Sequence, residues 1–204
     1  TKQEYFNSFI PDFDLMISAA KEEYWEIKKH CDKFDDELLN EAANFGENYR
    51  AIISLAYRQA VAAHKLGCDD KNNLIFLSKE CESNGCMGTI DLTYPSMPLF
   101  LKYNPELVEA MLRPIVKYAK SKEWQYNFVP HDVGRYPIAN GQWYGKNDDS
   151  EKQLSSQMPI EETGNMLLCL AAVKKYSEST PRLFEENAEL MKTWADYLVK
   201  YGYD

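Results

Sequence analysis

The sequence lacks the features that would assign it to a membrane, nucleic-acid-binding or signal-bearing class. No apolar run approaches the roughly 20 residues that a membrane-spanning helix needs, so no membrane span is predicted. Positively charged residues are outnumbered, since the sequence has 23 Lys and Arg against 32 Asp and Glu. The resulting net charge of −9 argues against nucleic-acid binding, because binding phosphate requires a basic face. The chain opens on TKQEYFNSF, without an initiator Met or an apolar leader, and we expect it to be an excised or processed segment.

Recognisable cysteine motifs are missing as well. The five cysteines have no C-x-x-C spacing, and no His stands near them at the spacing of zinc ligands. We therefore predict no metal site and no cofactor. Cys81 and Cys86 are close enough in sequence to bridge across a turn, but their spacing does not decide between a disulfide and two thiols.

The pattern that is present is globular and helical. The chain has 204 residues, of which 45% are apolar, and this is enough to bury the core of one domain; we treat 1–204 as a single helical domain. Apolar residues three and four positions apart, with caps and terminators at the ends, predict helices. The predicted helices are 12–31, 35–45, 47–66, 91–103, 104–124, 159–177 and 180–202, and the one predicted strand is 72–80.

Local signals support several of these boundaries. Gly67 is expected to stop the helix before it, and Asp91 to cap the helix that begins there. Asn104 is a predicted cap followed by Pro105 in the first turn. Pro159 and Pro181 are expected to open the last two helices in the same way.

The connections between helices are of two lengths. The turns near residues 104 and 178–180 are short, so each joins a helical hairpin. The connections 67–90 and 125–158 are long, and long ordered loops usually carry function. If the helices alternate in direction, both long loops lie at one rim, beside the first turns of helices 91–103 and 159–177.

The last hairpin pairs two different helices. Residues 166–173, MLLCLAAV, are apolar all round, which predicts that helix 159–177 is covered on every side. Helix 180–202 has a charged face and is expected to lie outside it. An inner helix beside an outer one predicts an all-α fold: helical hairpins forming part of an α/α toroid, with at most one short strand hairpin.

The first candidate functional segment is SKECESNGCMGTIDLTYPS, residues 78–96. Asn84-Gly85 and Gly88 permit tight turns and close approach of a ligand. Asp91 is either a helix cap or a ligand-binding carboxylate, and Asn84 is a second candidate for substrate binding.

The second segment is FVPHDVGRYPIANGQWYG, residues 128–145. It gathers ionisable and aromatic side chains among prolines and glycines. Either an Asp–Arg pair merely holds this loop together, or the loop lines a site; the number of convergent groups favours a site. Asp132 is the candidate acid or base, and the candidate substrate-binding residues are His131, Arg135, Tyr136 and Trp143.

The third segment is the first turn of helix 159–177. Acidic residues there complement the helix dipole, which is enough to explain one exposed Glu. Glu162, however, shares a helix face with Asn165, Met166 and Cys169, a face predicted to be buried. Glu162 and its neighbour Glu161 are therefore candidate catalytic carboxylates, and Asn165 a candidate substrate ligand.

Taken together, these stretches resemble the helical domain of the glutaminase A family, found in fungi and in bacteria such as Bacteroides. The resemblance rests on ENYRAIISLAYRQAVAAHKL, SNGCMGTIDLTYPSMPLFLKYNPELVEAML, HDVGRYPIANGQWYG, MPIEETGNMLL and TWADYLV. It implies a larger parent with a β-rich N-terminal region before a six-hairpin α/α toroid like those of glycoside hydrolases. The chain is then expected to be the first part of that toroid, with the remaining domains of the parent as its partners.

The resemblance also implies hydrolysis of L-glutamine to L-glutamate and ammonia, in a secreted or periplasmic protein. In this reading a carboxylate, Glu162 or Asp132, activates water, while His131 or Arg135 stabilises charge or holds the substrate. The alternative is a glycoside hydrolase that uses Asp132 and Glu162 as an acid/base pair, with the loop aromatics stacking on sugar. A carbohydrate-binding module without catalysis is the third hypothesis.

Three expectations follow from these assignments. The carboxyls of Asp132 and of Glu161 or Glu162 should lie within roughly 5–10 Å of each other. In the parent protein, Asp132→Asn and Glu162→Gln should each reduce turnover by at least about a hundredfold with little effect on stability, because charge is removed while shape is kept. An exposed apolar flank where further hairpins belong should promote self-association.

Overall fold

The computed structural model describes residues 3–4, 10, 12–80, 82–145, 156–177 and 182–203. The chain divides into two compact units, residues 1–72 and 73–204, and each is described by itself. That 1–204 form a single domain stays a prediction.

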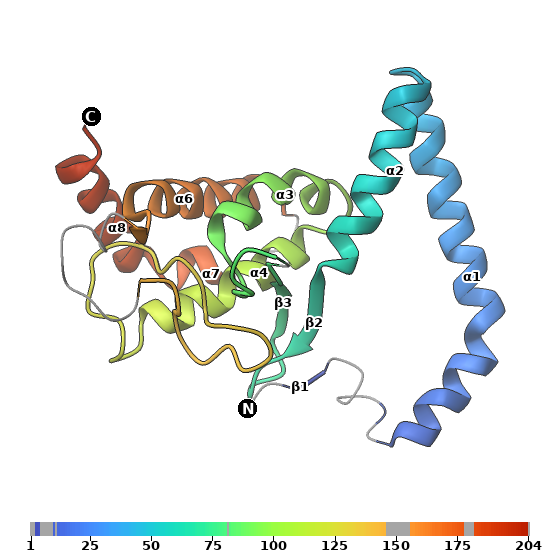
Figure 1. The fold of residues 1–204 in the computed structure, drawn as a ribbon, viewed down its shortest axis with the longest axis horizontal. Coiled ribbons are helices and arrows are strands. Elements are labelled where there is room, and N and C mark those ends of the chain that lie inside the picture. The colour runs from blue at the N-terminus through green and yellow to red at the C-terminus, as the bar shows by residue number, and fades with distance from the viewer. Residues whose placement is uncertain are drawn as a thin grey trace. The chain divides into compact units, whose positions relative to one another are not determined.

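The first unit is a helical hairpin with a small sheet. Helices α1 (Phe13–Ala43) and α2 (Glu47–Ala62) run in opposite directions and pack against each other (Figure 1). Asp12 caps α1 by accepting a hydrogen bond from the backbone N–H of Leu15. Strand β2 (His64–Cys68) follows α2 and pairs antiparallel with the two-residue strand β1 (Gln3–Glu4).

Two of the predictions for this unit are wrong. The predicted break between helices 12–31 and 35–45 does not exist, since α1 continues through it and the intervening residues contain neither Gly nor Pro. Helix 47–66 ends at Ala62 instead, and Gly67 lies within β2 opposite Glu4 rather than terminating a helix. The region 72–80 is therefore not the only strand.

The second unit carries the helices that build the site. Strand β3 (Leu74–Ser78) packs against α4 (Pro105–Ala119), which forms a hairpin with α3 (Ile90–Tyr103). Helix α6 (Pro159–Tyr176) contacts both α3 and α4 on one side and α8 (Ala188–Tyr201) on another (Figure 1). The short helix α7 (Arg182–Glu185) precedes α8.

Apolar side chains at helical spacing form the core of this unit. Fully or almost fully buried residues come from each of its main helices, which accounts for their mutual packing. They include Ile90, Phe100, Val108, Met111, Leu112, Ile115, Met166, Leu170 and Trp194.

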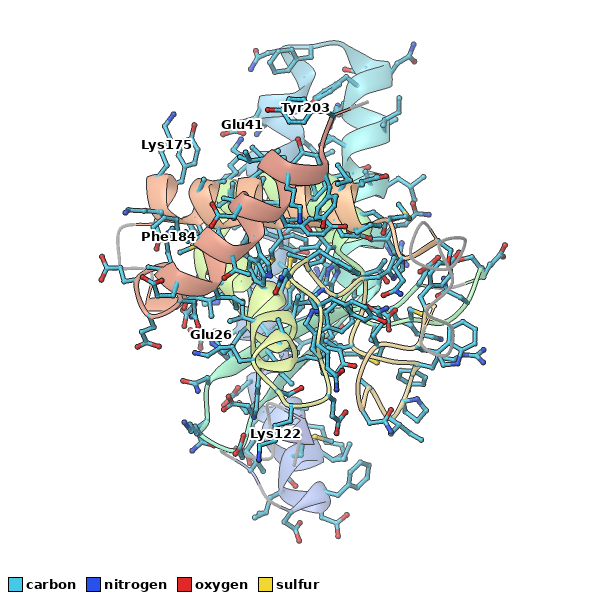
Figure 2. All side chains as sticks on the ribbon, turned by 90° about the vertical axis from the view of Figure 1, so that its left-hand side faces the viewer. Glu26, Glu41, Lys122, Lys175, Phe184 and Tyr203 are labelled. Carbon is cyan, nitrogen blue, oxygen red and sulfur yellow. The ribbon has the colours of Figure 1, made fainter. Side chains whose placement is uncertain are left out.

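The expectation that α6 is covered on every side is wrong for the described residues. Its buried stripe follows the 3.6-residue period, whereas Leu168 remains 54% exposed and Tyr176 is also exposed. At the end of the helix Lys175 points away from the neighbouring helices (Figure 2). The expected apolar flank and the expected self-association both stay predictions.

Several helix ends differ from their predicted positions. Helix α3 begins at Ile90 with Thr89 as its N-cap residue, so Asp91 lies inside the first turn and does not cap. Asn104 caps α4 as predicted, by accepting a hydrogen bond from Glu106 N–H, but that helix ends at residue 119 rather than 124.

The predicted helix 180–202 is two helices, α7 and α8. Buried Asn187 separates them: its Nδ2 donates to Leu183 O and its Oδ1 accepts from Lys120 Nζ. The role of Pro181 lies outside the described residues. Among the described residues no helix combines the length and the apolarity needed to cross a membrane.

Candidate active site

Backbone hydrogen bonds bring the two predicted functional loops together. Met87 N–H donates to Gly134 O (2.9 Å), and Val133 N–H donates to Met87 O (3.0 Å). Ile90 N–H, at the start of α3, donates to His131 O (3.2 Å). The segment before α3 and the loop after α4 are therefore held side by side, although about forty-five residues separate them in sequence.

Gly134 permits the loop to fold back on itself. Its φ of +111° suits glycine, and a Cβ there would stand 2.7 Å from Gly141 O. Gly141 N–H in turn donates to Val133 O (2.9 Å), which closes the loop around Asp132.

A buried hydroxyl ties the same loop to α6. Val129 N–H donates to Thr163 Oγ1 (3.0 Å), and Thr163 is fully buried. Pro159 opens α6 as predicted, which places Glu162 and Thr163 in its first turn and a half. The loop thus meets the N-terminal ends of both α3 and α6.

Asp132 stands at the centre of this arrangement, fully buried. Its Oδ1 accepts hydrogen bonds from Gly134 N–H (2.7 Å) and Trp143 N–H (3.0 Å). Its Oδ2 accepts from Tyr144 N–H (3.2 Å) and lies 3.1 Å from His131 Nδ1. Burial alone raises the pKa of a carboxyl, but these four partners outweigh burial and hold the pKa of Asp132 below its usual value.

His131 lies between two carboxylates. The ionised Asp132 can only accept, so His131 Nδ1 carries a proton and donates to it, and Nε2 faces the other carboxylate. Nε2 lies 3.6 Å from Glu162 Oε1. The backbone N–H of His131 donates to Gln142 Oε1 (2.7 Å), and the ring of Tyr144 stacks on the imidazole with a 4.5 Å centroid separation. The ring is therefore fixed in both position and tautomer.

Glu162 is 0% exposed, and neither carboxylate oxygen makes a hydrogen bond among the described residues that meets ordinary geometric limits. Burial, and then the neighbouring charges of Asp91, Glu161 and Asp132, raise the pKa of Glu162 to about 9. The backbone N–H of Asp91 is directed at this carboxylate and opposes the shift only weakly. The site thus holds a buried carboxyl without a matching positive charge.

Asp91 completes the cluster from the first turn of α3. It is half-buried, and its Oδ1 is buried without a hydrogen-bond partner among the described residues. Asp91, His131 and Glu162 each offer one ligand atom, and these atoms all lie within 4.8 Å of one another. Asp91 alone of the cluster is partly open to solvent.

The cluster therefore contains Asp91, His131, Asp132 and Glu162. This agrees with the prediction that both long loops lie at one rim, beside the first turns of helices 91–103 and 159–177. The imidazole of His131 separates Asp132 from Glu162, so those two carboxyls do not face each other across open space. Glu161, the other candidate in this turn, is exposed. Its catalytic role, like that of the other candidates, stays a prediction.

The remaining predicted residues lie away from the four clustered side chains. Arg135 places its guanidinium over the Trp143 ring (4.6 Å), and both are exposed. Tyr136 is likewise exposed, with Lys79 Nζ over its ring. Asn84 Oδ1 accepts from Cys86 N–H (2.7 Å) and so shapes the turn, while Asn165 is half-buried on α6.

Three supporting residues were not among the predicted site residues. Gln142 links the His131 backbone to Tyr144 O and to Gln157 Oε1, with Nε2 donating at 2.6 and 2.8 Å. Gln142, Gln157 and Thr163 are all buried. No sequence signal marks them, because a buried Gln or Thr is identified only by the partners that satisfy its amide or hydroxyl.

Neither buried thiol near the site is suited to be a nucleophile. Cys86 and Cys169 are free and fully buried. Burial raises the pKa of each thiol to about 12, with the Asp132 charge adding at Cys86 and the Glu162 charge at Cys169. Both are therefore protonated at neutral pH. Cys81, the possible partner of Cys86, lies outside the described residues.

Comparison with known proteins identifies the family to which the sequence is similar. Residues 46–204 match the family described as the glutaminase A six helical-hairpin domain. The chain is 33% identical over 168 residues to "Glutaminase A" of Aspergillus oryzae, covering 81% of this chain and 23% of that protein. It is 30% identical to a "Probable glutaminase" of Arthroderma benhamiae, covering 80% and 18%. The chain thus spans about a fifth of the length of these relatives. No solved structure matches it significantly.

Proposed function

The chain belongs to the glutaminase A six helical-hairpin family, and on that premise we propose that it supplies the Asp91–His131–Glu162 cluster to the hydrolysis of a carboxamide. L-Glutamine is the first candidate substrate, because the two relatives are named as a glutaminase and a probable glutaminase. The observation that carries the proposal is the convergence of these three side chains, two of them fully or almost fully buried, at the junction of α3, α6 and the 128–145 loop.

In the proposed reaction, water adds to the side-chain carbonyl carbon of the substrate and the bond from carbon to nitrogen breaks. One proton of the water passes to the departing nitrogen, which leaves as ammonia, and the hydroxyl group remains on the new carboxyl. The lone pair of His131 Nε2 is the available base for that water, since its partner nitrogen is held by Asp132.

Asp132 has a positioning role in this scheme. Its four hydrogen-bond partners occupy both oxygens, so it has no free lone pair in a useful direction for substrate. It fixes the His131 tautomer instead, as the Asp of a Ser–His–Asp triad does. For the same reason, an Asp132–Glu162 acid/base pair of the glycosidase type is the less supported hypothesis.

The proposal is tested by ammonia release from L-glutamine, with L-asparagine and aryl glycosides as comparison substrates. We expect glutamine to be preferred, and His131→Gln and Glu162→Gln each to reduce turnover by about a hundredfold or more, the size of a lost acid or base. Glu189→Gln is the comparison, because it removes an exposed first-turn carboxylate from α8 and should change turnover less than about twofold. Equal loss in all three variants, or sugar release without ammonia release, would contradict the proposal.

A further inference from the structure

We propose that Asp91, His131 and Glu162 bind one divalent transition-metal cation of the Zn²⁺ or Mn²⁺ class. The inference deepens the proposed function and rests on it only for what a bound water would do. The binding site itself stands on the arrangement of the three side chains.

The spacing of the ligand atoms suits a metal ion after a small adjustment. With metal–ligand bonds of about 2.0–2.2 Å, neighbouring ligand atoms of a tetrahedral site lie about 3.4 Å apart. His131 Nε2 and Glu162 Oε1 are 3.6 Å apart, and the full set of three lies within 4.8 Å. The proposal requires the wider separations in this set to shorten on binding, and Asp91 is the only half-buried side chain of the three.

The unsatisfied oxygens point to a missing positive charge. Both Glu162 oxygens and Asp91 Oδ1 are buried without hydrogen-bond partners among the described residues. Such groups require an explanation, since an unpaired buried polar atom costs about 1–3 kcal/mol and a charged one more. His131 is the only basic side chain that the described ion pairs place against these carboxylates, and Nδ1 already belongs to Asp132. A cation between the three ligands would pair with one oxygen of each carboxylate and would supply the missing positive charge.

The surroundings of His131 are those of a metal-binding imidazole. A histidine that binds metal through one nitrogen usually donates the other N–H to a carboxylate, which fixes the ring and its tautomer. Asp132 takes that position at 3.1 Å, and the Tyr144 ring stacks against the imidazole. One imidazole with two carboxylates favours Zn²⁺ or Mn²⁺ over Ca²⁺ and Mg²⁺, which prefer oxygen ligands alone. In a metal-bound site the His131 Nε2 lone pair would be a ligand and not the base of the proposed reaction. Three protein ligands leave a position open for water, whose pKa the metal would lower, so the metal would take over the activation of that water.

Metal binding is measured directly, apart from activity. The protein is stripped with a chelator and dialysed against Mn²⁺ or Zn²⁺, and bound metal is determined by elemental analysis. A Cys31→Ser background removes an exposed thiol next to His30, because thiolate and imidazole are the ligand types that Zn²⁺ prefers. We expect one equivalent to bind, with absorption from substituted Co²⁺ as a second reporter.

Variants separate this site from other binding. Glu162→Gln and Asp91→Asn should abolish stoichiometric binding, and Asp132→Asn should weaken it by about 10–100-fold through the orientation of His131. Glu189→Gln, an exposed first-turn carboxylate of α8, should bind as the wild type does. Circular dichroism identifies any variant that fails to fold, and the Co²⁺ spectrum of the wild type then decides alone.

The outcomes distinguish this inference from the proposed function. Stoichiometric metal without ammonia release supports the site and counts against the glutaminase proposal. Ammonia release that survives chelation, in a protein that takes up no Mn²⁺, Zn²⁺ or Co²⁺, refutes the metal site and leaves the proposed reaction standing. Binding that all variants retain also refutes the site.

Discussion

Asp132→Asn is the substitution whose outcome the structure specifies most closely. The wild-type carboxylate accepts four hydrogen bonds and donates none. An Asn side chain keeps one acceptor oxygen, which can still serve Gly134 and Trp143 N–H. Its NH₂ group, however, replaces the oxygen that faces Tyr144 N–H and His131 Nδ1. The shape of the side chain is preserved. The N–H groups of Tyr144 and of His131 Nδ1, however, now face the NH₂ donor of Asn instead of an acceptor oxygen.

The change in the free energy of unfolding depends on whether the His131 tautomer changes in the variant. If its tautomer stays unchanged, two buried donors lose their acceptor, at about 1–3 kcal/mol each, so the free energy of unfolding falls by about 2–6 kcal/mol. If the proton moves to Nε2, Nδ1 accepts from the new NH₂ and only Tyr144 N–H is orphaned, which lowers the free energy by about 1–3 kcal/mol. In that case Nε2 has lost its lone pair toward Glu162. The expectation of unchanged stability, made from shape alone, is therefore replaced.

Urea denaturation followed by circular dichroism measures the change in unfolding free energy, and long-range proton–nitrogen NMR correlations report the His131 tautomer. Asp196→Asn is the control, because this exposed Asp on α8 should change stability by no more than about 0.5 kcal/mol. A folded Asp132→Asn protein with wild-type stability and an unchanged His131 tautomer would refute the reasoning. With that tautomer, Tyr144 N–H and His131 Nδ1 would both lack an acceptor, and stability should fall.

Two further predictions concern the loop and the thiols. Gly134→Ala should destabilise the protein by at least about 2 kcal/mol, because the new Cβ would collide with Gly141 O and φ is positive there. Gly164→Ala should instead stabilise the protein by about 0.5–1 kcal/mol, because this position lies on α6 with open space around it. Thermal denaturation of both variants measures the difference. Cys86 and Cys169 should resist iodoacetamide at neutral pH, because the pKa of each thiol is raised to about 12, while the exposed Cys31 should react. Peptide mass mapping that finds either buried thiol modified in the native protein would contradict this prediction.

The sequence by itself determined the helical class and the location of the candidate loops. Helical periodicity with proline and cap signals located α3, α4 and the start of α6, because those signals are local. The same periodicity placed Glu162 on the face of Met166 and Cys169, and all three are fully buried. Unequal loop lengths indicated which rim would hold the site.

Other features were decided by contacts between distant residues. Within β2, Gly67 and Cys68 pair with Glu4 and Gln3, partners far away in sequence, although the local pattern continues the helix before them. The helix predicted over 180–202 divides where Asn187 meets Lys120, a partner 67 positions away.

Contacts between residues that are distant in sequence also decided which side chains make up the site. Ligand spacing predicted no metal site, since the proposed ligands come from three separate segments at residues 91, 131 and 162. The role of Asp132 depends on backbone amides twelve residues away, at Tyr144, which consume its acceptor capacity. A sequence pattern records which side chains face the same way on one element. Only the tertiary structure determines which hydrogen bonds those side chains have already made, and therefore which atoms remain free to bind or react.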